Sequence, residues 1–220
     1  MSTEPPTVHR ILVVEDHPVV RAGLRELIDA EPDLQICAES GTVTDALKLA
    51  RQEPPELAII DLSLPDGNGI DLIKRLKADL PELRMLVCSM HDESLYAERV
   101  INAGAHGYLN KQQITKQVLE AIRQVLGGRI YLNAAMVQRV INGFAKKKEG
   151  ACSSIEDLSN RELEVFDLIG QGLATSKIAA RLHLSVKTVE THREKIKRKL
   201  QLATGGELVR HAVQWQMEQA

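Results

Sequence analysis

Short apolar runs alternate with helical patterns along the first 126 residues, and this alternation strongly constrains the fold. Continuous apolar runs rich in β-branched residues are typical of strands buried on both faces of a parallel sheet. The predicted strands are 11–14, 34–39, 57–60, 85–88 and 107–110. The predicted helices are 19–30, 44–52, 70–80, 94–103 and 114–126. Five β-α units of this kind predict an α/β fold with a doubly wound, five-stranded parallel sheet.

A glycine-containing and lysine-rich joint divides the chain. Gly127-Gly128 ends the last of these helical patterns, a weaker one follows at 134–148, and polar residues continue to Ser154. Residues 1–130 carry 14 Lys and Arg against 20 Asp and Glu, whereas residues 131–220 carry 14 against 10. Such asymmetry favours two domains with different partners. We predict an N-terminal domain at 1–128, a linker with a helix at 129–154, and a C-terminal domain at 155–220.

Composition excludes several classes of protein. No apolar run approaches the roughly 18 residues that span a bilayer, and residues 1–9 do not have the features of a signal peptide. Cys37, Cys88 and Cys152 lie far apart and exclude a cysteine-rich zinc site. Aromatic residues make up only 3% of the chain, which disfavours base-stacking platforms. We expect a cytoplasmic protein with no membrane partner.

Polar residues follow the predicted strands where each strand ends. Glu15 and Asp16 follow the first strand, Asp61 the third, Ser89 the fourth and Lys111 the fifth. The carboxyl ends of parallel strands meet at one edge, where ligands bind in doubly wound folds. Three carboxylates in a small space favour a hard divalent cation, most simply Mg²⁺. A lysine and a hydroxyl beside them suit a phosphoryl group, and Asp61 is the candidate acceptor that would form an acyl phosphate.

The C-terminal part has the pattern of a helix-turn-helix module. Ser159 and Glu162 have the spacing of a capping box before an apolar helical pattern. Thr175 is predicted to cap a short helix at 176–182, and Ser185 a longer one at 186–200. The longer helix carries six Lys and Arg against two Glu. Short polar residues in its first turns and basic residues along it suit the major groove of DNA, although a solvated amphipathic helix has the same pattern.

Residues 10–126 resemble the receiver domain of two-component response regulators, in the stretches ILVVEDHPVVRAGL, LAIIDLSLPDGNGIDL, MLVCS and GAHGYLNK. The resemblance implies that Asp61 is the phosphorylated residue and that Asp16 and Asp61 hold Mg²⁺ with the backbone carbonyl of Ser63. Glu15 would act mainly through metal-bound water. His17 lies in the same loop and is not counted as a ligand.

The same resemblance assigns roles around the phosphoryl group. Ser89 and Lys111 would contact it, and Tyr108 matches the aromatic residue that changes rotamer when the Ser hydroxyl moves toward the phosphate. Ordinary strand packing would equally explain an amphipathic ring at Tyr108. Asn110 departs from the family pattern, which usually has an apolar residue before the lysine.

Residues 155–216 resemble the LuxR-type DNA-binding domain, in the stretch LSNRELEVFDLIGQGLATSKIAARLHLSVKTVETHREKIKRKL. The two parts together resemble the NarL/FixJ family of response regulators, which implies that 186–200 is the recognition helix. The implied DNA-contact residues are Lys187, Thr188, Glu190, Thr191, Glu194 and Lys195. The implied phosphate contacts are Thr175, Arg193 and Arg198, with His192 or Arg193 as alternative braces of the helix. Lys177 stands where the family usually has Glu.

The resemblance implies a DNA-binding response regulator of a two-component system. A sensor histidine kinase would phosphorylate Asp61, and this would gate dimerisation, binding of double-stranded DNA and transcription control. The expected active form is a homodimer, with RNA polymerase as a further partner. The chain would not be a turnover enzyme, although its receiver would take phosphate from a small donor with Mg²⁺ and lose it slowly.

Two alternatives belong to other classes. A phosphatase of the haloacid dehalogenase type would need a second Asp two residues after the nucleophile, and Asp61-Leu62-Ser63 lacks it. The other alternative is a phosphorylation-independent regulator, or an adaptor that acts through protein contacts with a degenerate helix-turn-helix.

Overall fold

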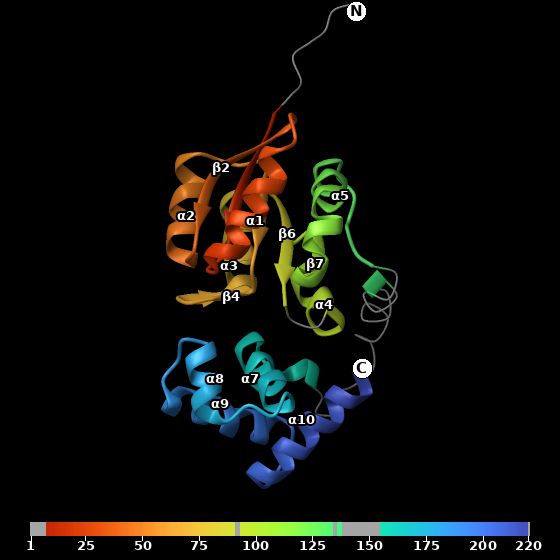
Figure 1. Cartoon of the computed structure of the whole chain (residues 1–220). Helices are drawn as coiled ribbons and strands as arrows, with labels where there is room; N and C mark the ends of the chain where they lie inside the picture. Colours follow the sequence, from red (N-terminus) through yellow and green to blue (C-terminus); the bar gives the residue numbers. More distant parts are fainter. Residues whose placement is uncertain (1–7, 91–92, 134–135, 138–154, 220) are drawn as a thin grey trace, which may run out of the picture. The chain divides into compact units, whose positions relative to one another are not determined.

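The computed structural model describes residues 8–90, 93–133, 136–137 and 155–219, which belong to two compact units (Figure 1). The first unit lies within residues 1–145 and the second within residues 146–220. The linker helix predicted at 134–148 lies outside the described residues except for 136–137. No helix of the described part is both long enough and apolar enough to cross a membrane.

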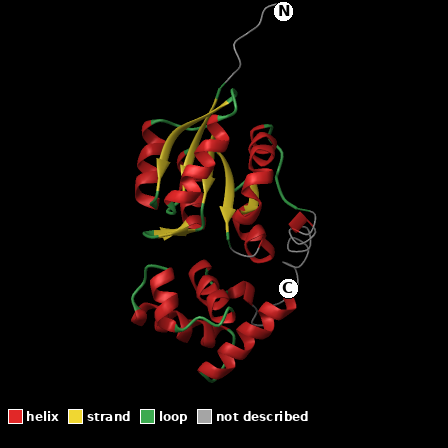
Figure 2. Ribbon diagram, viewed as in Figure 1, coloured by secondary structure: helices red, strands yellow, loops and turns green. Residues whose placement is uncertain are grey.

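The first unit is built on a five-stranded parallel sheet (Figure 2). Its strands run in the order β2-β1-β3-β6-β7, so β3 is central and is followed in sequence by Asp61. The strands are β1 His9–Val14, β2 Leu34–Ser40, β3 Leu57–Ile60, β6 Arg84–Ser89 and β7 Gly107–Asn110. The predicted α/β class, strand number and parallel arrangement are confirmed.

Helices cover both faces of this sheet (Figure 2). They are α1 Pro18–Asp29, α2 Val43–Gln52, α3 Gly69–Asp79, α4 Glu93–Ala103 and α5 Ile114–Leu126. Leu24 and Ile28 of α1 share one buried core with Val118 and Ile122 of α5 and with alternate residues of the strands. Helix α3 contacts both α2 and α4. Because the strands are covered on both faces, β3 is apolar at every position, as the sequence predicted.

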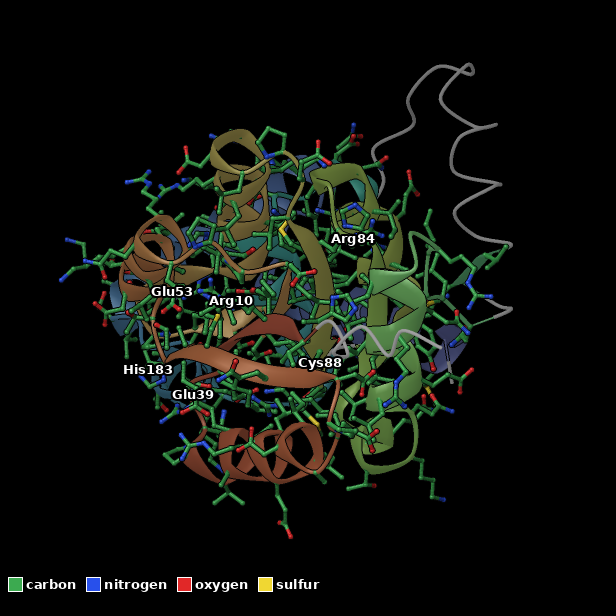
Figure 3. All side chains as sticks on the ribbon, turned by 90° about the horizontal axis from the view of Figure 1, so that it is seen from above. Arg10, Glu39, Glu53, Arg84, Cys88 and His183 are labelled. Carbon is green, nitrogen blue, oxygen red and sulfur yellow. The ribbon has the colours of Figure 1, made fainter. Side chains whose placement is uncertain are left out.

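Polar contacts tie the ends of this unit together. The guanidinium of Arg10 in β1 lies 2.5 Å from the carboxylate of Glu53, directly after α2, and Figure 3 shows the two residues side by side. Arg84 at the start of β6 donates to the carbonyl of Val125 at the end of α5, over 2.8 Å. Both contacts lie where a helix ends, and the one from Arg84 supplies a donor to a carbonyl that has no partner within the helix.

Two small features were not predicted. The strands β4 Ser63–Leu64 and β5 Gly67–Asn68 form a hairpin directly after Asp61. Tyr131 extends the sheet beyond its edge strand β7: its carbonyl accepts from the Tyr108 amide and its amide donates to His106, both over 2.9 Å. The chain therefore stays attached to the β7 edge after α5 has ended.

The second unit is all helical. It contains a short 3-10 helix, η2 Ile155–Asp157, followed by α7 Asn160–Gly170, α8 Thr175–Arg181, α9 Val186–Lys199 and α10 Gly205–Gln219. Phe166 of α7 is fully buried, and its ring centre lies 5.7 Å from that of Trp215 and 5.9 Å from that of His211, both on α10. The fold class predicted for this part is confirmed.

The predicted helix caps have different outcomes. Ser159 and Glu162 form the capping box of α7, and Ser185 caps α9 through the amide of Thr188. The prediction that Thr175 caps α8 is wrong, because the helix begins at Thr175 and its cap residue is Ala174, which has no side chain to accept a hydrogen bond. His183 makes the turn between α8 and α9 with a φ of 53°.

Candidate functional site

The ends of β1, β3 and β7 place a lysine between two carboxylates. The Lys111 ammonium lies 2.8 Å from Oδ2 of Asp61 and 2.6 Å from Oε2 of Glu15. All three side chains are nearly excluded from solvent, with 7% of Lys111, 3% of Glu15 and 2% of Asp61 exposed. The strand order explains this convergence, because β1 and β3 are neighbours and β6 alone separates β3 from β7.

The electrostatics of this cluster follow from its burial. Burial and the nearby charge of Asp61 raise the pKa of Glu15, and the charge of Lys111 offsets them only in part. Burial would lower the pKa of Lys111, but the charges of Asp61 and Glu15 outweigh it, so the pKa is raised. The ammonium of Lys111 therefore stays charged, whereas Glu15 ionises less readily than an exposed glutamate.

The acidic side of the pocket has the donor chemistry of a divalent cation site. Glu15, Asp16, His17 and Asp61 each offer a ligand atom, and these atoms lie within 4.8 Å of one another. Oδ1 of Asp16 is buried and accepts no hydrogen bond from a described residue. It lies 2.6 Å from Nδ1 of His17, whose ring also lies 3.0 Å from Glu15. A buried carboxylate oxygen without a hydrogen bond, beside two more carboxylates, fits a hard cation such as Mg²⁺.

The other predicted pocket residues lie on the same edge of the sheet. Ser89 is the last residue of β6 and is fully buried. Tyr108 lies in β7, where it pairs with Val87 of β6, and only 1% of it is exposed. Ser63 is half-buried, two residues after Asp61. The structure thus places the predicted pocket residues at or just after the carboxyl ends of β1, β3, β6 and β7. Tyr108 is the exception, because it lies within the edge strand β7.

Two residues near Asp61 were missed by the sequence reasoning. Gly69 begins α3, and a Cβ on it would lie 2.3 Å from the Asp61 carbonyl oxygen and 2.7 Å from Cα of Leu62. Asp66, in the turn of the β4–β5 hairpin, accepts from the amides of Val43 and Thr44 and from the Thr44 hydroxyl, over 2.6 to 2.9 Å. Pro65-Asp66-Gly67 has residues typical of a turn, but nothing in the sequence indicates its contact with α2, which precedes it by more than 20 residues.

A second candidate site is the exposed face of α9. Lys199 at the end of α9 lies 2.6 Å from Glu162 and donates to the Asp157 carbonyl, which holds α9 against the start of α7. Arg161 of α7 pairs with Glu164 and donates to the Leu182 carbonyl at the end of α8. Val189 and Ile196 fix the inner face of α9 in the core. The opposite face is therefore presented rigidly to solvent.

The predicted contact residues divide into two groups on this surface. The exposed ones are Lys187, Glu190, Thr191, Glu194, Lys195 and Arg198. The half-exposed ones are Thr175, Thr188 and Arg193. The Thr188 hydroxyl lies 2.7 Å from that of Ser185 at the helix start. His192 is half-buried, and burial together with the charge of Lys195 lowers its pKa, which suits a brace better than a cation on the surface.

Two known protein families match this chain, one in each of its compact units. The family described as the response regulator receiver domain matches residues 11–123, and the luxR family of bacterial regulatory proteins matches residues 156–212. The chain belongs to the LuxR-type response regulators. The regulator thus combines both families, and each match lies within one compact unit.

Individual relatives match between about two thirds and nearly all of the chain. The regulator is 33% identical over 209 residues to the oxygen regulatory protein NreC of Staphylococcus haemolyticus, covering 93% of this chain and 96% of the relative. A LuxR-family response regulator from Aurantimonas is 31% identical with a TM-score of 0.58, over 64% of this chain and all of that one. RcsB from Salmonella enterica, bound to the rprA promoter, has a TM-score of 0.62 at 23% identity, covering 94% and 99% of the two chains, and so shows the shared fold.

Proposed function

We propose that this protein is a transcription regulator whose binding to double-stranded DNA is gated by phosphorylation of Asp61. The observation that carries the proposal is the buried Asp61 carboxylate, 2.8 Å from Lys111 and beside the acidic pair Glu15 and Asp16. The functional parts would be a receiver at 1–128, a linker at 129–154 and a DNA-binding domain at 155–220. The donor would be a sensor histidine kinase, and the regulator would act in the cytoplasm.

Phosphoryl transfer would use groups already in the pocket. An oxygen of Asp61 attacks phosphorus, the bond between phosphorus and the donor's nitrogen or oxygen breaks, and the donor leaves with the bonding electron pair. Lys111 is placed to offset charge on the phosphoryl oxygens, and Ser89 supplies a hydroxyl. Asp16, Asp61 and the Ser63 carbonyl would hold Mg²⁺, with Glu15 acting through water, and the ion would supply charge stabilisation.

The signal would then leave the pocket through the strand that carries Tyr108. A shift of Ser89 toward the phosphoryl group would open space for a new rotamer of Tyr108. Phosphorylation would favour one of two arrangements of the regulator, because the phosphoryl group would interact more favourably with that arrangement.

We propose a homodimer as the active form of the regulator. It would bind two DNA half-sites about one helical turn, roughly 10 bp, apart, and RNA polymerase would be a further partner.

The test of the acceptor is intact mass after treatment with Mg²⁺ and a small phosphodonor such as acetyl phosphate. The wild type should gain one phosphoryl group, and the Asp61→Asn variant should gain none. The adduct should disappear slowly, without steady turnover of the donor. If the wild type and the variant both gain the phosphoryl group, the acceptor is a residue other than Asp61. Rapid continuous hydrolysis of a small phosphoester would favour the phosphatase alternative instead.

A further inference from the structure

The exposed surface of α9 consists of two rows of side chains along the helix. One row has Val186, Glu190, Glu194 and Arg198 at intervals of four residues, and the other has Lys187, Thr191 and Lys195. Residues four apart lie on one face of a helix, one above the other. The second row and Arg198 suit the phosphate backbone of DNA. The two glutamates are like-charged with that backbone and weaken any binding that depends on charge alone.

The two glutamates have different surroundings. Glu194 is paired with the ammonium of Lys197 over 2.9 Å. Glu190 is exposed and forms no ion pair or side-chain hydrogen bond with any residue that the structure describes. Val186 and Glu194, four residues away, cannot neutralise it, and the basic residues three positions away, Lys187 and Arg193, form no ion pair with it among the described contacts. Glu190 is thus a free acceptor on the face that would enter the major groove.

The base edges in the major groove restrict what such a group can bind. A carboxylate only accepts hydrogen bonds, and the amino donors in that groove are N4 of cytosine and N6 of adenine. Adenine places the N7 acceptor beside its donor, which repels a carboxylate and suits an amide instead. Cytosine has no such acceptor beside its N4 group. We propose that Glu190 is a specificity-determining residue that selects a cytosine in each half-site, an inference that rests on the proposed DNA-binding function.

The residues next to Glu190 on the exposed face, Thr191 and Val186, are less suited to recognise the amino group of a base. The Thr191 hydroxyl donates its proton to the Lys187 carbonyl over 2.9 Å, so it offers no donor to a base in this rotamer. Val186 is 45% exposed one turn earlier and offers only an apolar contact, of the kind that a thymine methyl makes. The charge of Glu190 would therefore contribute to specificity, because it weakens binding to DNA sequences that have no amino donor at the base pair facing Glu190.

The test is selection of bound duplexes from a random pool by the full-length regulator with Mg²⁺ and beryllofluoride. The wild type should enrich a motif with cytosine at one position of each half-site. Glu190→Gln should replace that cytosine by adenine, with a change in preference of about tenfold, because the amide of Gln matches N6 and N7 of adenine. Glu26→Gln makes the same change of charge on the exposed surface of α1 and should keep the wild-type motif.

Three other outcomes would overturn the proposal. A Glu190→Gln motif identical to that of the wild type would remove Glu190 from base recognition. Tighter binding of all sequences by that variant, with no change of preference, would show a purely electrostatic effect. A wild-type regulator that enriches no motif would contradict the proposed sequence-specific function itself, and this distinguishes the two failures.

Discussion

At the scale of single residues, Gly69 lies so close to the backbone of Asp61 and Leu62 that no side chain fits there. A methyl group on it would lie 2.3 Å from the carbonyl oxygen of Asp61, far inside van der Waals contact. Both partners of that clash are backbone, so they cannot move aside as a flexible side chain would. We expect Gly69→Ala to lower the free energy of unfolding by about 1–3 kcal/mol and to slow phosphorylation of Asp61.

Gly23 provides the matched control for this prediction. It lies in the middle of α1, is exposed, and a Cβ on it would meet no atom within 4 Å. Gly23→Ala should therefore raise the free energy of unfolding by roughly 0.5–1 kcal/mol, since alanine restricts the unfolded chain and favours the helix. Denaturant titration of both variants measures the contrast. If Gly69→Ala and Gly23→Ala had the same free energy of unfolding, the backbone around Asp61 would be able to shift and accommodate the added methyl group at little cost.

At the scale of secondary-structure elements, Asp66 joins the hairpin after Asp61 to the start of α2. Burial would raise its pKa, but hydrogen bonds from the Thr44 and Val43 amides outweigh this and hold the pKa below its usual value of 3.8. The first amides of a helix have no partner within the helix, and Thr42 supplies only one of the acceptors they need. Asp66 supplies the others from a distant part of the chain.

Removal of this contact should destabilise the first unit in a pH-dependent way. Asp66→Ala should cost about 1 kcal/mol at neutral pH, as loss of a helix cap does. A carboxyl with a lowered pKa contributes stability that is fully present above 3.8 and is lost as the pH falls through the lowered value. The difference between wild type and variant should therefore shrink only below about pH 3.8. Urea titrations at a series of pH values test this, with the exposed Glu82→Ala as control; a difference that does not depend on pH would contradict it.

The sequence predicted elements that are defined by long apolar patterns and missed those that are defined by one or two contacts. β3 and α5 begin and end where the sequence predicted. The hairpin β4–β5 has two residues in each strand, too few for a periodic pattern, and Tyr131 joins the edge of β7 through single hydrogen bonds. The pocket was predictable because strand ends of a parallel sheet converge. The contact of Lys111 with both Glu15 and Asp61 was not, because a long flexible side chain has many rotamers.

At the scale of the whole molecule, charge is distributed unequally between the two parts, and this has a measurable consequence for DNA binding. Lys187 and Lys195 are exposed on one row of α9. If each meets a phosphate, its replacement by Ala should reduce the slope of log affinity against log salt concentration by about 0.9. Lys48 is also exposed but lies on α2, and Lys48→Ala should leave the slope unchanged. An unchanged slope for Lys187→Ala or Lys195→Ala would show that the residue does not contact phosphate.

In the proposed function, occupation of the Asp61 pocket controls DNA binding by the α9 face. The direct measurement is the affinity of the full-length regulator for a duplex carrying its selected motif, with Mg²⁺, in the presence and absence of beryllofluoride. We predict that beryllofluoride tightens binding by about 5- to 150-fold, the usual range of coupling between two sites, and that Asp61→Asn abolishes this response. Equal affinity of the wild type with and without beryllofluoride would contradict the claim and indicate a DNA-binding regulator that is controlled by other means.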